Sequence, residues 1–218
     1  ISELNYKSKN KKKILGGIQI IKYKNNSIFF DTGEPPNKDF SNTYQSGPLS
    51  FEYFLDNEKI ITNCGFGSNI SSKAEFLSRL TSAQSTLTIN DTSVTRFERN
   101  KLINKVFGYS IKNSFKISEL NFREEPDQII STASHNGYLK KFGCLHKRTI
   151  SLNKSTKQMF GYDELIKKEN GRPINYHLRF HLNPGLTAVK TIGGNSILIQ
   201  INKNKSLLFS VKDETILL

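Results

Sequence analysis

Residues 49–63 of the chain read LSFEYFLDNEKIITN, and this stretch decides the fold. Short apolar runs stand on both sides of Asp56-Asn57, and Asp and Asn are residues that favour tight turns. Two such runs around a turn are typical of a β-hairpin. We therefore predict two antiparallel strands, over 49–55 and 59–63.

The same pattern recurs along the rest of the chain. A hairpin is predicted from 14–23 and 27–31, with Asn25-Asn26 as its turn. Further strands are expected at 85–90, 115–122, 128–135, 149–152, 157–165, 175–182, 187–191, 196–201 and 206–212. Strands this frequent predict an all-β fold, an antiparallel β-sandwich of many short strands. No linker divides the chain, so we expect a single domain over 1–218.

Two stretches depart from this pattern. Residues 71–80 predict one short helix, in which Ser71 and Ser72 can cap the N-terminus and three apolar residues share a face: Phe76, Leu77 and Leu80. Residues 93–113 are rich in Arg, Lys and Asn, so we expect an exposed insertion between strands.

The net charge of the chain has two explanations. Its formal net charge is +13, which suits an acidic polysaccharide, and no nucleic-acid motif accompanies it. Basic residues scattered over a solvated surface explain the same number more simply. The sequence has no run of about 18 apolar residues, so no membrane span is expected. It begins with Ile1 and its single methionine is Met159, so we expect it to be part of a longer polypeptide.

Cysteines and histidines are few. Cys64 and Cys144 form no CxxC pair, which excludes zinc-ribbon and thioredoxin-like sites; they form a disulfide or, more commonly for isolated cysteines, are small buried residues. His177 and His181 would lie about 13 Å apart in one strand, too far to share a metal. His181 precedes a turn, which favours a structural role.

Four segments together resemble one family. They are GPLSFE at 47–52 with IITNCG at 60–65, SAQSTLTIND at 82–91, HNGY at 135–138 with FG at 142–143 and HKR at 146–148, and RFHLNPG at 179–185. Their order and spacing are similar to the C-terminal β-sandwich domain of bacterial heparinase II/III-like polysaccharide lyases.

The resemblance implies a function for the whole polypeptide. Such proteins join an N-terminal α/α toroid to this sandwich and cleave acidic polysaccharides by β-elimination in the periplasm or cell envelope. A base removes the proton at C5 of a uronate, and nearby donors stabilise the resulting negative charge. Most of this machinery lies on the toroid. The sandwich supplies one catalytic histidine and a zinc site with three ligands.

The family's zinc site is altered in this sequence. The catalytic histidine position falls on Thr43, and the three ligand positions fall on Gln45, Asn63 and Gln84. A neutral amide is a poor zinc ligand. We therefore predict no metal and no cofactor, and expect the three amides to satisfy one another by hydrogen bonds.

Other residues match the family pattern better. His135 and His146 occupy its histidine positions, either as catalytic candidates facing the toroid and the cleft or as hydrogen-bonded structural residues. Arg148 and Arg179 are candidates to bind uronate carboxylates, since arginine forms bidentate pairs, although exposed strand arginines are usually just solvated.

Two functions remain open from the sequence. In the first, the chain is one wall of the substrate cleft of a polysaccharide lyase, inactive alone, with an acidic polysaccharide and the toroid as partners. In the second, it is a non-catalytic glycan-binding or scaffolding module that has lost the catalytic histidine and the zinc ligands. Binding to nucleic acid is not expected.

Overall fold

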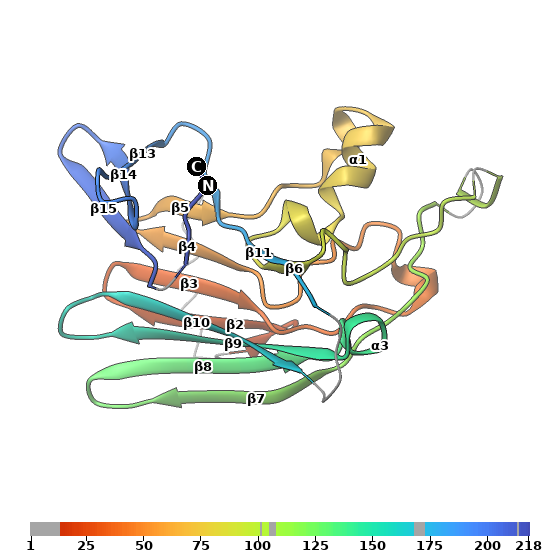
Figure 1. Ribbon diagram of the computed structural model, residues 1–218, viewed down its shortest axis with the longest axis horizontal. Coiled ribbons are helices and arrows are strands. Elements are labelled where there is room, and N and C mark those ends of the chain that lie inside the picture. The colour runs from red at the N-terminus through yellow and green to blue at the C-terminus, as the bar shows by residue number, and fades with distance from the viewer. Residues whose placement is uncertain (1–13, 101, 105–107, 168–172, 213) are drawn as a thin grey trace, which may run out of the picture.

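The computed structural model describes residues 14–100, 102–104, 108–167, 173–212 and 214–218. Antiparallel strands dominate this part of the chain and form sheets of six, four, two and three strands (Figure 1). The predicted all-β sandwich is confirmed. None of the described helices is long and apolar enough to span a membrane.

The six-stranded sheet contains the stretch that decided the fold. Its order is β1 (Ile14–Leu15), β2 (Ile18–Tyr23), β3 (Asn26–Asp31), β4 (Phe51–Leu55), β5 (Glu58–Thr62) and β12 (His181–Leu182). Asp56 and Asn57 form the β4–β5 turn with φ of 52° and 66°, a left-handed conformation that short polar residues tolerate. The β2–β3 turn lies at Lys24 and Asn25, one residue earlier than predicted.

The four-stranded sheet packs on the six-stranded sheet. Its order is β10 (Met159–Lys167), β9 (Cys144–Asn153), β8 (Gln128–His135) and β7 (Ile117–Glu124). The core between the two sheets is apolar and includes Ile28 and Phe30 from one side and Ile129 and Ile150 from the other. Strand β9 begins five residues before the predicted 149–152. The prediction missed this part of the strand because its inward-facing positions are occupied by Cys144, His146 and Arg148, which do not form an apolar pattern.

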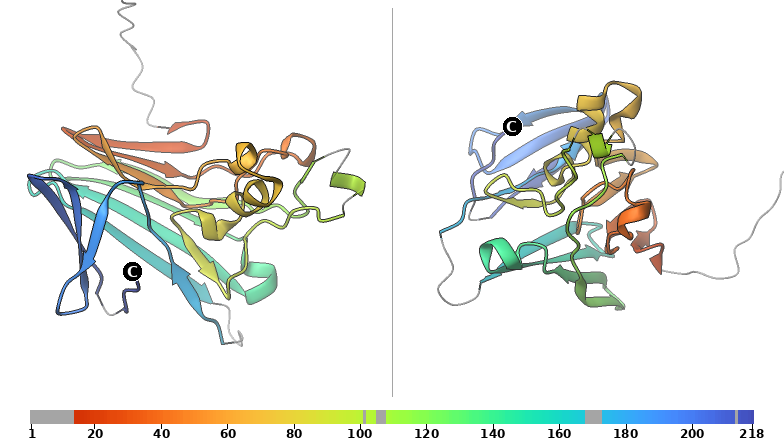
Figure 2. Two further views of the ribbon diagram at one scale, coloured as in Figure 1. Left: turned by 90° about the horizontal axis from the view of Figure 1, so that it is seen from above. Right: turned by 90° about the vertical axis from the view of Figure 1, so that its right-hand side faces the viewer.

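Two smaller sheets complete the sandwich. β6 (Leu87–Ile89) pairs with β11 (Tyr176–Leu178), and β13 (Thr187–Lys190), β14 (Ser196–Asn202) and β15 (Lys205–Ser210) form the other. The three-stranded sheet stands at one end of the molecule (Figure 2). The single strand predicted at 175–182 is wrong: the chain breaks at Arg179-Phe180, so that β11 pairs with β6 and β12 pairs with β5.

Helices are short and lie at the other end of the molecule. α1 (Ser72–Ser78) confirms the predicted helix, and the Ser71 hydroxyl accepts the Ala74 N–H at 3.0 Å as its cap. Leu77, expected on the buried face, is 47% exposed. α3 (Leu139–Phe142) was not predicted. The described residues include three 3-10 turns: η1 (Lys38–Phe40), η2 (Gly67–Asn69) and η3 (Thr81–Ala83).

Residues 93–113 are not simply an exposed insertion. Val94, Phe97 and Ile111 are buried, and a β-bridge joins Phe97 to Ile111. The base of this segment is therefore part of the folded body, although Leu102 is 79% exposed. The prediction of a fully exposed insertion was wrong because it relied on the many basic and amide residues. The three buried apolar residues among them follow no regular period that would have indicated burial.

Candidate functional site

The three positions to which the resemblance assigns zinc ligands meet in space. The side-chain amide of Gln45 donates to the Cys64 carbonyl at 3.3 Å, next to Asn63. The Asn63 Oδ1 accepts the backbone N–H of Ser85, next to Gln84, at 2.8 Å. The chain thus brings the end of β5, the loop before β4 and the segment before β6 together, as the resemblance implies.

The three amides do not bond to one another, which corrects the prediction of a shared hydrogen-bonded cluster. The buried Gln84 donates to the Ser78 carbonyl at 2.8 Å, so within the described chain each amide bonds a backbone group. Backbone groups at loops and strand ends lack ladder partners and must be satisfied there. The amides therefore fix the local backbone.

This donor set does not fit zinc. Neutral amides replace the imidazole and carboxylate ligands that zinc prefers. No group of three His, Cys, Asp or Glu side chains in the described part of the chain is placed to hold a metal. Thr43, at the family's catalytic histidine position, is exposed and has no acid–base group.

We expect purified protein to contain far less than one zinc per chain. The triple variant Gln45→His, Asn63→Asp, Gln84→His should gain zinc, because the three positions already converge. Elemental analysis of both proteins after dialysis measures this. Stoichiometric zinc in the unsubstituted protein would contradict the prediction, and the triple variant is the positive control.

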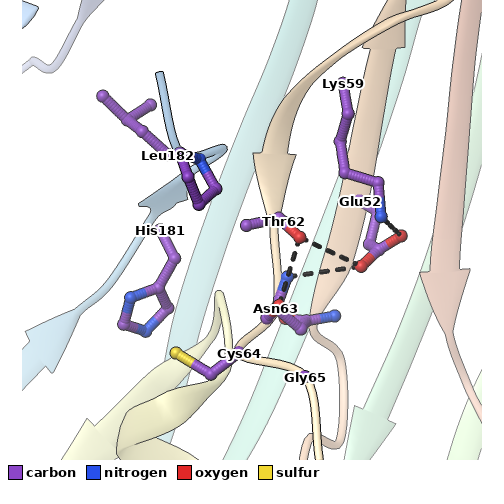
Figure 3. A pocket seen from close by; sticks show the side chains of 9 residues that line it. Glu52, Lys59, Thr62, Asn63, Cys64, Gly65, His181 and Leu182 are labelled. Carbon is purple, nitrogen blue, oxygen red and sulfur yellow. Dashed lines mark hydrogen bonds and ion pairs between the residues drawn. The ribbon is translucent and has the colours of Figure 1, made fainter. Parts of the chain in front are cut away.

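A pocket of about 470 Å³ opens beside Asn63 (Figure 3). It is lined by Glu52, Lys59, Thr62, Asn63, Cys64, Gly65, His181, Leu182 and Pro184. Glu52 forms an ion pair with Lys59 at 2.8 Å and accepts the backbone N–H of Asn63 at 3.3 Å. Besides this ion pair, the pocket offers an amide and an imidazole, which are suited to a polar ligand.

The two cysteines do not form a disulfide. Cys144 is buried, as isolated cysteines commonly are, whereas Cys64 is exposed at the rim of the pocket. Partial burial of its sulfur raises the pKa of the Cys64 thiol above its ordinary value, so the thiol stays protonated at neutral pH. Next to it, the Nε2 of His181 donates to the Ser82 carbonyl at 3.1 Å, which fixes the orientation of its ring.

His135 and His146 lie in a buried chain of hydrogen bonds. Both are 0% exposed. The Gly137 N–H donates to His135 Nδ1 at 3.1 Å, so the His135 proton is on Nε2, which lies 3.2 Å from His146 Nδ1. The Nε2 of His146 then donates to Asp163 Oδ1 at 2.6 Å. Each imidazole is held in one neutral tautomer.

The hydrogen-bonded chain ends at the negative charge of Asp163, which is balanced by the positive charge of Arg148. Arg148 donates to both carboxylate oxygens of Asp163, at 2.8 and 3.2 Å, and to the carbonyls of Leu49 and Ser85. Burial alone would raise the pKa of Asp163, but the charge of Arg148 and the bonds from His146 and Arg148 hold it at about 2. Burial, reinforced by Arg148, lowers the pKa of both histidines.

The buried network corrects the expectation for Arg148. Arg148 is 1% exposed and its donors are occupied, so it stabilises the sandwich and does not present a guanidinium to a uronate. His135 and His146 are buried and hydrogen-bonded, as the structural alternative expects. Asp163 was missed, yet the register of the β9–β10 hairpin places it directly opposite Arg148.

Arg179 is more accessible than Arg148. Its side chain is 29% exposed and donates to the carboxylate of Asp91 at 3.0 Å. The Asp91 carboxylate also lies 3.2 Å from the Nδ1 of His177. The hydrogen bond from Arg179 lowers the pKa of Asp91 below its ordinary value. Arg179 thus belongs to an ion-paired surface cluster where β6 and β11 pair and just beyond their ends, and it does not line the pocket beside Asn63.

Comparisons with known proteins agree on the type of domain. The family model described as heparinase II/III-like, C-terminal, matches residues 12–217. The crystal structure of the heparan sulfate lyase HepC from Pedobacter heparinus is 16% identical, with a TM-score of 0.65 over 88% of this chain and 27% of that one. The crystal structure of Heparinase III is 13% identical, with a TM-score of 0.62 and the same coverage. A search of curated proteins found no match.

Proposed function

Because the chain belongs to the heparinase II/III-like family, whose C-terminal domain it matches over residues 12–217, we propose that it forms one wall of the substrate cleft of a polysaccharide lyase. The substrate would be a uronate-containing acidic polysaccharide, cleaved by β-elimination. The observation that carries the proposal is the pocket beside Asn63, at the point where the family's ligand positions converge. The net charge of +13 suits such a substrate.

The chain spans about a quarter of the length of the solved lyases that it resembles, with 27% of HepC covered. We therefore assign the catalytic base to a toroid domain of the same polypeptide, in the periplasm or cell envelope. In this chain Lys59, Asn63 and His181 would bind and orient the glycan. Lys59 would exchange its ion pair with Glu52 for one with a glycan carboxylate, and the two other side chains would provide hydrogen bonds.

A second function is favoured by one observation, the chemistry of the altered site. Amides occupy the three ligand positions, threonine occupies the catalytic position, and His135 and His146 are buried. A glycan-binding module without catalysis would keep the pocket and the fold while losing these groups. Both functions need the pocket, and they differ in whether the polymer is cleaved.

A lyase assay separates the two functions. The natural polypeptide and the 218-residue chain alone are incubated with heparan sulfate, alginate and pectate, and ultraviolet absorbance reports new unsaturated uronate ends. Cleavage by the natural polypeptide and not by the chain alone supports the first function. Binding without cleavage supports the second, and neither binding nor cleavage contradicts both.

Variants test the role of the pocket. Lys59→Ala should weaken glycan binding by about tenfold, because one charge-assisted hydrogen bond is lost. Lys140→Ala removes an exposed charge on α3, outside the pocket, and should leave binding unchanged. Equal binding by both variants would remove the pocket from the proposal.

A further inference from the structure

The outer face of the four-stranded sheet carries two exposed aromatic rings. On β8 and β9, Ile129 and Ile150 face the core, so the alternate residues point outward. On the edge strand β10, Phe160 is 56% exposed and Tyr162 is 63% exposed. Two residues apart on one strand, both rings stand on the same face, roughly 7 Å from each other. The four strands run side by side in Figure 1.

Polar side chains continue from these rings across the sheet. Cross-strand pairing places Tyr162 in one row with Thr149, Thr132 and Asn121. The two threonine hydroxyls bond to each other at 2.9 Å. Pairing puts Phe160 in the neighbouring row, which ends at Arg123 on the opposite edge. With strands about 4.8 Å apart, each row extends for about 14 Å.

Several polar groups on this face have no partner in the described part of the chain. They are the Tyr162 hydroxyl, the Asn121 amide, the Ser151 hydroxyl and the Arg123 guanidinium. The next row differs, because Lys147 there is paired with Glu119 at 2.8 Å and lies opposite Glu164. Arg123 is therefore the positive charge on this face that is left without an ion pair among the described residues.

The combination points to one class of ligand. Exposed aromatic rings on an edge strand are unusual, since charged residues normally protect such edges. Rings offer flat apolar surfaces to the C–H faces of a sugar, and hydroxyl and amide groups bond its hydroxyls. A guanidinium binds a carboxylate or sulfate through two parallel hydrogen bonds.

We propose that this face binds an acidic glycan chain that lies across the strands, from Phe160 and Tyr162 to Arg123. The site is separate from the pocket beside Asn63, which lies at β5 and β12 of the other sheet. The inference rests on the proposed function for the class of ligand and adds a second contact with the same polymer. Two contacts on one chain raise the effective concentration of the glycan at the pocket.

The test is titration calorimetry of the 218-residue chain with heparan sulfate and alginate oligosaccharides, and with dextran as a neutral probe. Tyr162→Ala and Phe160→Ala should each weaken binding by roughly three- to tenfold, while Tyr162→Phe keeps most of it. Arg123→Ala should weaken binding and reduce its dependence on salt. Leu208→Ala, at a 61% exposed site on β15, is the matched control and should bind normally.

The outcomes distinguish this inference from the proposed function. If the aromatic variants and Arg123→Ala bind like the unsubstituted chain while Lys59→Ala binds weakly, the outer face is excluded and the proposed function stands. Equal affinity for dextran overturns the assignment of an acidic ligand. If the unsubstituted chain binds neither acidic glycan, both proposals fail. Circular dichroism confirms that each variant is folded.

Discussion

Replacing Arg148 by methionine is expected to lower the free energy of unfolding by about 3–5 kcal/mol. The substitution preserves much of the volume but leaves the Asp163 carboxylate without the cation that holds its pKa at about 2. It also removes the donors for the carbonyls of Leu49 and Ser85, which lie on other segments of the sandwich. Urea unfolding followed by circular dichroism measures the loss.

Lys147→Met is the matched control for this experiment. Lys147 is the next residue on β9, but it faces outward and pairs with Glu119 at 28% and 46% side-chain exposure. Such exposed ion pairs contribute about 0–1 kcal/mol. A loss in Arg148→Met no larger than that in Lys147→Met would mean that the buried network is not a main source of stability.

Acidification is expected to destabilise the protein as the pH falls below about 6.5, the ordinary pKa of histidine. The folded chain lowers the pKa of His135 and His146, mainly by burial, whereas the unfolded chain does not. The unfolded state therefore binds more protons below that pH. The stability is fully present above it and falls by up to about 1.4 kcal/mol per pH unit for each histidine.

Asp31 acts in the opposite direction and must be controlled. Burial raises its pKa to about 6, although the Gly33 N–H partly offsets the increase. The folded state therefore takes up a proton at Asp31 as the pH falls from about 6 towards 4, and this uptake masks part of the loss from the histidines. Asp31→Asn should make the acid destabilisation steeper. Urea unfolding between pH 8 and 5 measures both proteins, and a constant free energy in Asp31→Asn would contradict the prediction.

The elements that sequence alone identified are those with local signals. The hairpin at 49–63 has its own turn, and α1 has Ser71 as its cap. Strand β9 was predicted too short because polar residues occupy its inward positions, and a periodicity of apolar residues cannot detect a buried ion pair. The break within 175–182 depends on two partner strands that are distant in sequence, so no local pattern reveals it.

The candidate site, like the fold, could be predicted from the sequence only in part. The convergence of Gln45, Asn63 and Gln84 followed from the resemblance, whereas their bonds to backbone groups depend on where each strand ends. Whether Arg148 faces the core or solvent depends on the register of β9. The presence of Asp163 directly opposite it in β10 would have suggested a buried pair.

The split of residues 176–182 between β11 and β12 has a consequence for synthesis. β6 and β5 acquire these partners after the ribosome has made everything from β7 to β10. Until then, the nascent chain has two open strand edges that can pair with another molecule. The last long-range pairings also close the largest loops, which slows folding. A ribosome stalled before residue 176 is therefore expected to hold an aggregation-prone intermediate.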